Sequence, residues 1–294
     1  MPSNKQTEVI WERLLAIPTI FVFVLFLSIF LLLFIRSTSI LEEKSLAEIL
    51  FSSVWNPSAG NFGLYPMIVG TIFVTVIAMI FSIPISILSA MYISEYAPGN
   101  IKSVVKSFID ILAGIPSVVY GMCAILVLVP LVRDHIGPFF GVTTTGYCIL
   151  TAGLTLAVMV FPIIISIVVE AFQAVPFSLR ESSLSVGATK WETVKYVVLR
   201  KASPSVYSAV FFGFGRAFGE TMAVAMVVGN LPMTPSSVFG SGMTLPSLIA
   251  TTYGDMMSLP LFDSAIMFAA LLLLVIVVIF NVFGRVILMK TQKR

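Results

Sequence analysis

Long apolar segments constrain the fold of this 294-residue chain more than any other feature of its sequence. A helix needs about 20 consecutive apolar residues to cross the hydrocarbon core of a bilayer. Backbone amides in lipid must be hydrogen-bonded within the segment, which favours helices over open strands. The sequence therefore predicts an all-α integral membrane protein with six transmembrane helices, at residues 18–35, 67–93, 109–132, 148–169, 204–229 and 265–289.

The composition excludes an ordinary soluble domain. Hydrophobic residues make up 58% of the chain and charged residues 11%, whereas a soluble domain carries about 25% charged residues. We expect one membrane domain at 18–289, with a cytoplasmic lead at 1–17, a cytoplasmic loop at 170–203 and a short cytoplasmic tail at 290–294. No small-residue cleavage site follows the first apolar segment, so we expect a retained helix rather than a signal peptide.

The distribution of lysine and arginine predicts the orientation. Cytoplasmic loops of membrane proteins carry an excess of these residues. With both termini in the cytoplasm, 13 basic residues fall on that side, and only Arg36, Lys44 and Arg133 fall on the other. The basic residues thus follow topology, and we do not expect nucleic acid as a partner.

Cysteine and histidine are too scarce and too scattered to indicate a metal site. Cys123 and Cys148 lie in or at the edge of apolar segments, and we expect them to pack as small apolar side chains. His135 is the one histidine, in an external loop without a second histidine or a cysteine nearby. We therefore expect neither a disulfide nor a bound metal.

Two opposite charges stand deep in the fifth apolar segment. A charge at the bilayer centre costs about 2.5–3.5 kcal/mol on insertion scales, and such residues usually face protein or water. Arg216 and Glu220 are four residues apart, so a continuous helix would place them on one face, where they can pair. Either they only neutralise each other, or they line an anion pathway. In a pathway, the guanidinium would replace water lost by the anion, and Glu220 would temper its charge.

Small residues repeat every fourth position in the same segment. Gly215, Gly219 and Ala223 predict a small-xxx-small stripe that lets another helix approach closely. On a helix this stripe lies about 100° from the charged face. We therefore expect it to pack at a subunit interface beside the pathway.

The charged loop at 170–203 contains helix signals around a glycine. Pro176 and Ser178 can start a helix, Glu181 then falls in its first turn, and Gly187 can end it. We expect a second helix at 190–200. Two short helices meeting at a glycine would make a compact knob for a soluble partner. The alternative is an ordinary solvated amphipathic loop.

Residues 181–187, Glu-Ser-Ser-Leu-Ser-Val-Gly, resemble the EAA-xxx-G loop of ABC importer permeases. Ser182 and Ser183 stand where that family prefers alanine, and Arg200 follows Leu199 where proline is common. Three further segments resemble the PstC-type permeases of phosphate importers. They are SEYAP at 94–98, LAGIPSVVYG at 112–121 and GRAFGETMAV at 215–224, and the resemblance runs from about 62 to 230.

The resemblance implies a type I ABC importer permease with a MetI-like fold, located in the inner (plasma) membrane of a bacterium or archaeon. It implies pairing with a PstA-like permease, two copies of an ATP-binding subunit and an external phosphate-binding protein, with phosphate as the substrate. The residues implied in coupling to the ATPase are Arg180, Glu181, Ser182, Ser183, Gly187 and Ala188.

The chain is not expected to be an enzyme and carries no Walker A motif, so ATP and Mg²⁺ would be bound by the partner ATPase. Three other functions are alternatives to this one. A sulfate or molybdate permease would look much the same, because those anions resemble phosphate in size and charge. An ion-coupled secondary transporter would usually carry several acidic residues in the membrane, whereas Glu220 is the one acid deep in a segment. A membrane enzyme would need a cluster of His, Asp, Glu or Cys at one membrane level, and the sequence shows none.

Overall fold

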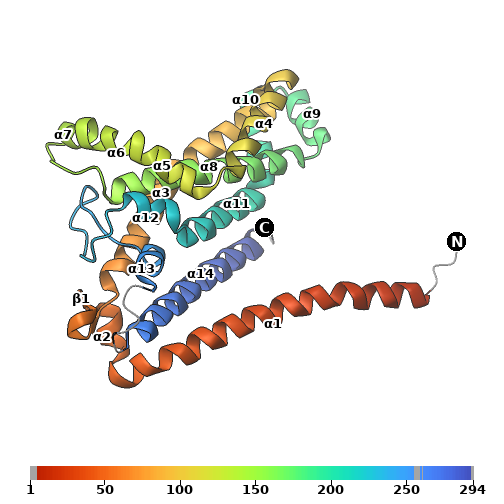
Figure 1. The fold of residues 1–294 in the computed structure, drawn as a ribbon. Helices are drawn as coiled ribbons and strands as arrows, with labels where there is room; N and C mark the ends of the chain where they lie inside the picture. The colour runs from red at the N-terminus through yellow and green to blue at the C-terminus, as the bar shows by residue number, and fades with distance from the viewer. Residues whose placement is uncertain (1–4, 255–258, 260, 293–294) are drawn as a thin grey trace.

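The computed structural model of the chain describes residues 5–254, 259 and 261–292, and this part is mostly helical (Figure 1). Its four longest helices are α1 (Lys5–Glu43), α3 (Tyr65–Met91), α8 (Ile149–Gln173) and α14 (Phe262–Gln292). Each contains a segment long and apolar enough to cross a membrane. The predicted all-α membrane fold is therefore confirmed. The predicted lead and tail lie partly outside the described residues.

The first helix is much longer than the predicted segment 18–35. α1 spans 39 residues and continues through Pro18 without ending. Its apolar stretch runs over Leu14–Glu43, and the most apolar 18 residues of that stretch include none that is buried within this chain. The helix exceeds the apolar segment because the polar residues that flank it include no glycine and no further proline to stop it.

The third predicted segment, 109–132, is not one straight helix. α4 (Gly99–Gly114) and α5 (Ser117–Leu126) meet at an angle of 96°. Ile115 between them is extended because Pro116 disfavours the helical conformation of the residue before it. α6 (Leu128–Leu131), the π-helix η3 (Val132–Ile136) and α7 (Gly137–Phe139) follow.

The fifth predicted segment, 204–229, also differs from a single helix. α11 (Leu199–Gly219) begins five residues earlier than predicted and contains Pro204. It ends at Gly219, and the extended residue Glu220 separates it from α12 (Met222–Val227). In the described part of the chain, four helices qualify as spans, or five if the bent pair α4–α5 is one span. The count of six stays a prediction.

The core lies where α3, α8 and α11 pack together. Figure 1 shows α8, α11 and α14 running alongside one another, with α1 next to α14. Gly153 on α8 faces the Ile77 side chain of α3, and Gly213 on α11 faces Ile164 of α8. Small residues at these positions let the backbones approach closely, as expected where lipid supplies no hydrophobic drive for helix association.

A second cluster of buried side chains lies at the other end of α3 from the core around α11. There a hairpin of β1 (Trp55–Asn56) and β2 (Asn61–Phe62) follows the short helix α2 (Leu46–Phe51). α13 (Leu245–Thr252) and the start of α14 complete this cluster. Cys148 is buried as predicted, whereas Cys123 on α5 is exposed.

The two ends of α8 bind different loops. Its N-terminal residues Ile149 and Leu150 donate backbone hydrogen bonds to Gly240 and Val238 in the loop before α13. Its C-terminus leads to α9 (Phe177–Ser185), at the other end of the molecule (Figure 1). The 25 residues of α8 span about 37 Å at 1.5 Å per residue, so these loops lie on opposite sides of a membrane that α8 crosses.

Candidate functional site

The loop at 170–203 forms the predicted helix and glycine turn. α9 starts after Pro176 and ends at Ser185, and Gly187 has a φ of +89°, in the left-handed region that favours glycine. The predicted second helix is correct at its start but not at its end. α10 (Lys190–Glu192) continues through the π-helix η4 (Thr193–Val198) directly into α11. Without a proline after Leu199, nothing stops the helix at Arg200.

The start of α10 is held by a capping box. The Glu192 backbone N–H donates to Thr189 Oγ1, and the Thr189 N–H donates to Glu192 Oε2 at 2.7 Å. These hydrogen bonds from the Thr189 backbone and hydroxyl lower the pKa of the Glu192 carboxyl. Across the turn, the hydroxyls of Ser183 and Thr193 lie 2.9 Å apart. α9 and the helix after it are therefore fixed relative to each other.

Arg180 turns inward from α9 to a carboxylate that sequence reasoning did not assign. Its Nη2 and Nε lie 2.8 and 3.2 Å from the two carboxylate oxygens of Glu95. Glu95 lies in the π-helix η2 (Tyr92–Tyr96) that extends α3. The only local signal was its place in the SEYAP segment, because the partner lies 85 residues away.

The remaining coupling residues lie at the surface of the turn. Glu181, Ser182 and Gly187 are exposed, and Ser183 and Ala188 are half-buried. Large apolar side chains surround them. Phe177 is 69% exposed and Val186 83% exposed. Sequence reasoning missed both, although exposed apolar side chains next to a charged loop are typical of a contact surface.

The charged residues of the fifth segment do not form the predicted pair. α11 ends between them, so the spacing of four does not put Arg216 and Glu220 on one helix face. The Glu220 carboxylate instead accepts a hydrogen bond of 3.3 Å from the Ala223 backbone N–H. Arg216 is exposed on this chain. No ion pair to Arg216 is present among the described residues.

The predicted stripe of small residues is divided by the same break. A Cβ on Gly219 would meet nothing within 4 Å, and one on Gly215 would lie 3.5 Å from Asn281 of α14. Ala223 belongs to α12 and is buried, with its Cα close to Gly121 of α5. Gly219 thus leaves open space beside α11, whereas Ala223 packs inside this chain. The expectation that all three form one continuous interface is wrong.

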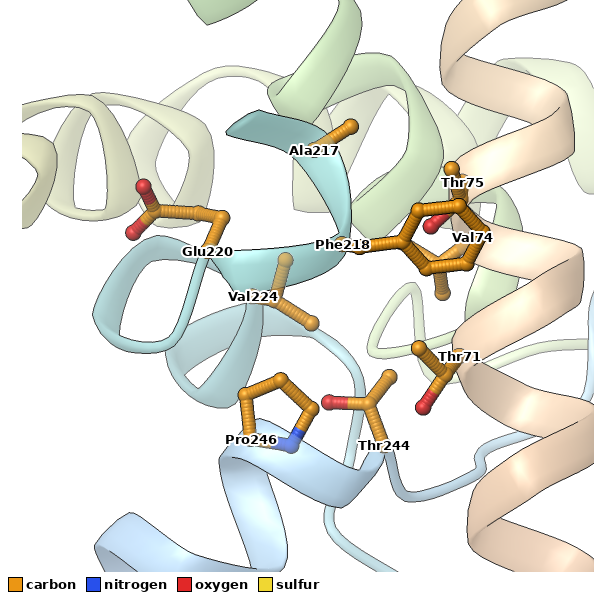
Figure 2. Close-up of a pocket in the computed structure, with 9 residues that line it drawn as sticks. All are labelled: Thr71, Val74, Thr75, Ala217, Phe218, Glu220, Val224, Thr244 and Pro246. Atoms are coloured by element: carbon orange, nitrogen blue, oxygen red, sulfur yellow. The ribbon is translucent and has the colours of Figure 1, made fainter. Parts of the chain in front are cut away.

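A small pocket lies beside the break between α11 and α12 (Figure 2). Thr71, Val74 and Thr75 of α3 line one wall, and Thr244 and Pro246 of the α13 start line another. Phe218 points towards α3, whereas the Glu220 carboxylate points away from the threonines (Figure 2). Thr71 Oγ1 accepts a hydrogen bond of 2.9 Å from the Leu245 N–H, which joins α13 to α3.

Comparison with known proteins agrees with this arrangement. Residues 82–292 match the family model of the binding-protein-dependent transport system inner membrane component. A solved inward-facing conformation of the MetNI methionine ABC transporter has the same fold, with a TM-score of 0.58 and 21% identity over 76% of this chain and 93% of that chain.

Curated relatives cover most of the chain. A probable phosphate transport system permease protein PstC of Methanocaldococcus jannaschii is 34% identical, over 92% of this chain and 91% of that protein. Proteins named phosphate transport system permease protein PstC from Xylella fastidiosa and Haemophilus influenzae are 36% and 32% identical, over 83% and 97% of this chain and 79% and 94% of their own lengths. The family match over residues 82–292 and the identity to these relatives show that the chain belongs to the family of inner membrane components of binding-protein-dependent transport systems.

Proposed function

We propose that this chain is the transmembrane permease subunit of an ATP-driven phosphate importer. The observation that carries the proposal is its 32–36% identity, over 83–97% of the chain, to relatives named as phosphate transport permeases. The chain would form half of the translocation pathway and pair with a PstA-like permease. Two copies of an ATP-binding subunit and an external phosphate-binding protein would complete the complex. ATP and Mg²⁺ would be bound by the ATP-binding subunit.

The surface around α9 supports docking of an ATP-binding subunit. Phe177, Leu184 and Val186 expose apolar side chains at the end of the molecule that lies beyond the core helices. Exposed apolar groups of this kind mark contact sites when polar residues surround them, and Glu181 and Ser182 lie on the same helix. We also propose that both termini lie in the cytoplasm and that the complex lies in an inner membrane.

The exposed Arg216 supports a pathway at the boundary of this chain. A guanidinium in a membrane segment is costly unless it faces water, an anion or a partner. Glu220 does not pair with Arg216 among the described residues. The positive charge of Arg216 can therefore act on an oxyanion that passes along the open side of α11. This chain and the PstA-like permease facing it would enclose the pathway, which one chain alone leaves open.

The chemistry of Arg216 is shared by other oxyanions. Sulfate and molybdate also present oxygens that match a guanidinium, so a sulfate or molybdate permease is the alternative. The names of the relatives favour phosphate. An ion-coupled secondary transporter would leave the exposed apolar surface of α9 without a role.

The test is ATP hydrolysis by the assembled complex in lipid nanodiscs. Binding protein loaded with phosphate is compared with empty binding protein, and sulfate and molybdate are then offered in place of phosphate. We expect ATP hydrolysis to be stimulated when the binding protein is offered phosphate, and not when it is empty or is offered sulfate or molybdate. Equal stimulation by sulfate or molybdate would assign another oxyanion, and hydrolysis that ignores the binding protein would contradict the importer function.

A further inference from the structure

The least exposed ion pair in the described part of the chain joins the loop at 170–203 to the end of α3. Glu95 and Arg180 form an ion pair in which the two side chains are only 9% and 14% exposed. Both carboxylate oxygens of Glu95 accept from Arg180, and Ser94 Oγ donates to Oε1 at 3.1 Å. Paired charges in this two-point geometry are held in register more strictly than a single contact would hold them.

Arg180 uses most of its donors inside the chain. Besides Glu95, its Nη1 donates to the Val175 carbonyl at 2.6 Å and its Nη2 to the Phe172 carbonyl at 2.8 Å. These carbonyls belong to the end of α8 and the residues after it, where a positive charge is favourable. A guanidinium has five N–H donors, so little of Arg180 is left for a contact with another subunit.

The other half of the contact is built into the end of α3. η2 is a π-helix, a form that is frequent at functional sites, and Ala97 before Pro98 is extended, which ends the helix there. Tyr96, which follows Glu95 in η2, also contacts the loop. Its ring lies under the Lys190 ammonium, which is 4.6 Å from the ring centroid. Two adjacent residues of η2 therefore hold both sides of the Gly187 turn, Glu95 through α9 and Tyr96 through α10.

We infer that Glu95 is a positioning residue for coupling, and that Arg180 acts inward through Glu95 rather than by touching the ATP-binding subunit. The Glu95–Arg180 ion pair makes α9, the end of α8 and the end of α3 move as one unit. A displacement of α9 by the ATP-binding subunit then reaches α3 and α8, two of the helices that form the core of the membrane domain. This inference rests on the proposed function, since it assigns the route by which the same loop transmits force.

The test uses the whole complex in proteoliposomes with wild-type chain, Glu95→Ala, Arg180→Ala and the double variant. Phosphate uptake and stimulated ATP hydrolysis are measured together, and retention of the ATP-binding subunit is quantified after purification. We expect each single variant to lower the phosphate moved per ATP hydrolysed by about fivefold or more, with the ATP-binding subunit retained. The double variant should be no worse than either single variant, because the two residues act as one unit.

Glu170→Ala is the matched control, because it removes an exposed carboxylate near the same end of α8 and should leave the ratio unchanged. Glu95→Gln replaces Glu95→Ala in the test if the complex with Glu95→Ala fails to assemble. The phosphate moved per ATP hydrolysed by Glu95→Gln should lie between the values for the wild type and for Arg180→Ala. An unchanged ratio in the Glu95 variants, or losses that multiply in the double variant, would overturn the inference. A wild-type complex without ATP-dependent phosphate uptake would contradict the proposed function instead. In that case the same variants would be compared by the ratio of stimulated to basal ATP hydrolysis.

Discussion

The end of α11 separates Arg216 from Glu220, and the Glu220 carboxylate accepts from the Ala223 N–H instead of pairing with the arginine. Glu220 thereby satisfies one of the free N–H groups at the start of α12. Arg216 stays exposed on the open side of α11, where Gly219 leaves room beside it. The break between α11 and α12 thus leaves Arg216 exposed at the boundary of the chain, while Glu220 accepts a hydrogen bond from the backbone of α12.

Replacing Arg216 with glutamine tests this assignment. Glutamine keeps most of the side-chain volume but removes the charge, so an anion would lose a charge-assisted contact. We expect phosphate uptake to fall by about tenfold or more, while the variant complex purifies with all its subunits. Arg200→Gln is the control, because it removes an exposed cation at the start of the same helix. Normal uptake by Arg216→Gln would exclude contact with the anion.

Gly187→Val tests the turn between α9 and α10. A Cβ at Gly187 would meet nothing within 4 Å, so the effect must come from its φ of +89°. A left-handed backbone costs a side chain about 1–2 kcal/mol, and the turn should shift to relieve it. We expect the binding-protein stimulation of ATP hydrolysis to be lost. Asparagine tolerates this conformation, so Gly187→Asn should keep the stimulation, and equal behaviour of the two variants would contradict the explanation.

Gly70→Ala tests the contact between α3 and the loop before α13. A Cβ at Gly70 would clash with the Met243 carbonyl oxygen, and backbone atoms cannot move away as a flexible side chain can. We expect a loss of stability of about 1–3 kcal/mol, as for other overpacked sites, measured as a lower Tm of the purified protein in detergent. Gly114→Ala is the control, since a Cβ there meets nothing within 4 Å. An unchanged Tm for Gly70→Ala would show that the loop does not pack there.

Cysteine labelling tests the orientation. Ser236 is exposed in the loop that binds the start of α8, and Ser182 is exposed on α9 beyond its end. In a Cys123→Ser, Cys148→Ser background, a membrane-impermeant maleimide should label Ser236→Cys in intact cells and Ser182→Cys only after permeabilisation. The reverse pattern would invert the proposed topology.

The long helices and the α9 turn were predictable because their signals are local. Apolar length alone indicates a membrane helix, and Pro176 and Gly187 bracket α9 through their own backbone preferences. The bend at Ile115 also has a local cause in Pro116. It was missed because the apolar residues continue across the bend and resemble one span. The break after Gly219 was missed because the spacing of Arg216 and Glu220 was interpreted on a continuous helix.

Glu95 was beyond sequence reasoning for a different reason. Its partner Arg180 lies 85 residues away, and only the packing of α3 against α8 brings η2 to α9. Charge pairs of this kind depend on tertiary structure. Each residue alone resembles one more solvated charge in a cytoplasmic loop.

The most direct test of the central claim is labelled phosphate uptake into proteoliposomes that hold this chain with its co-purified partners. ATP and binding protein are supplied or withheld, an ion gradient is imposed in a parallel sample, and excess sulfate serves as competitor. We predict accumulation that requires both ATP and binding protein and that sulfate does not reduce. Uptake driven by the ion gradient without ATP would contradict the proposed ATP-driven import. Strong competition by sulfate would show that the substrate is another oxyanion.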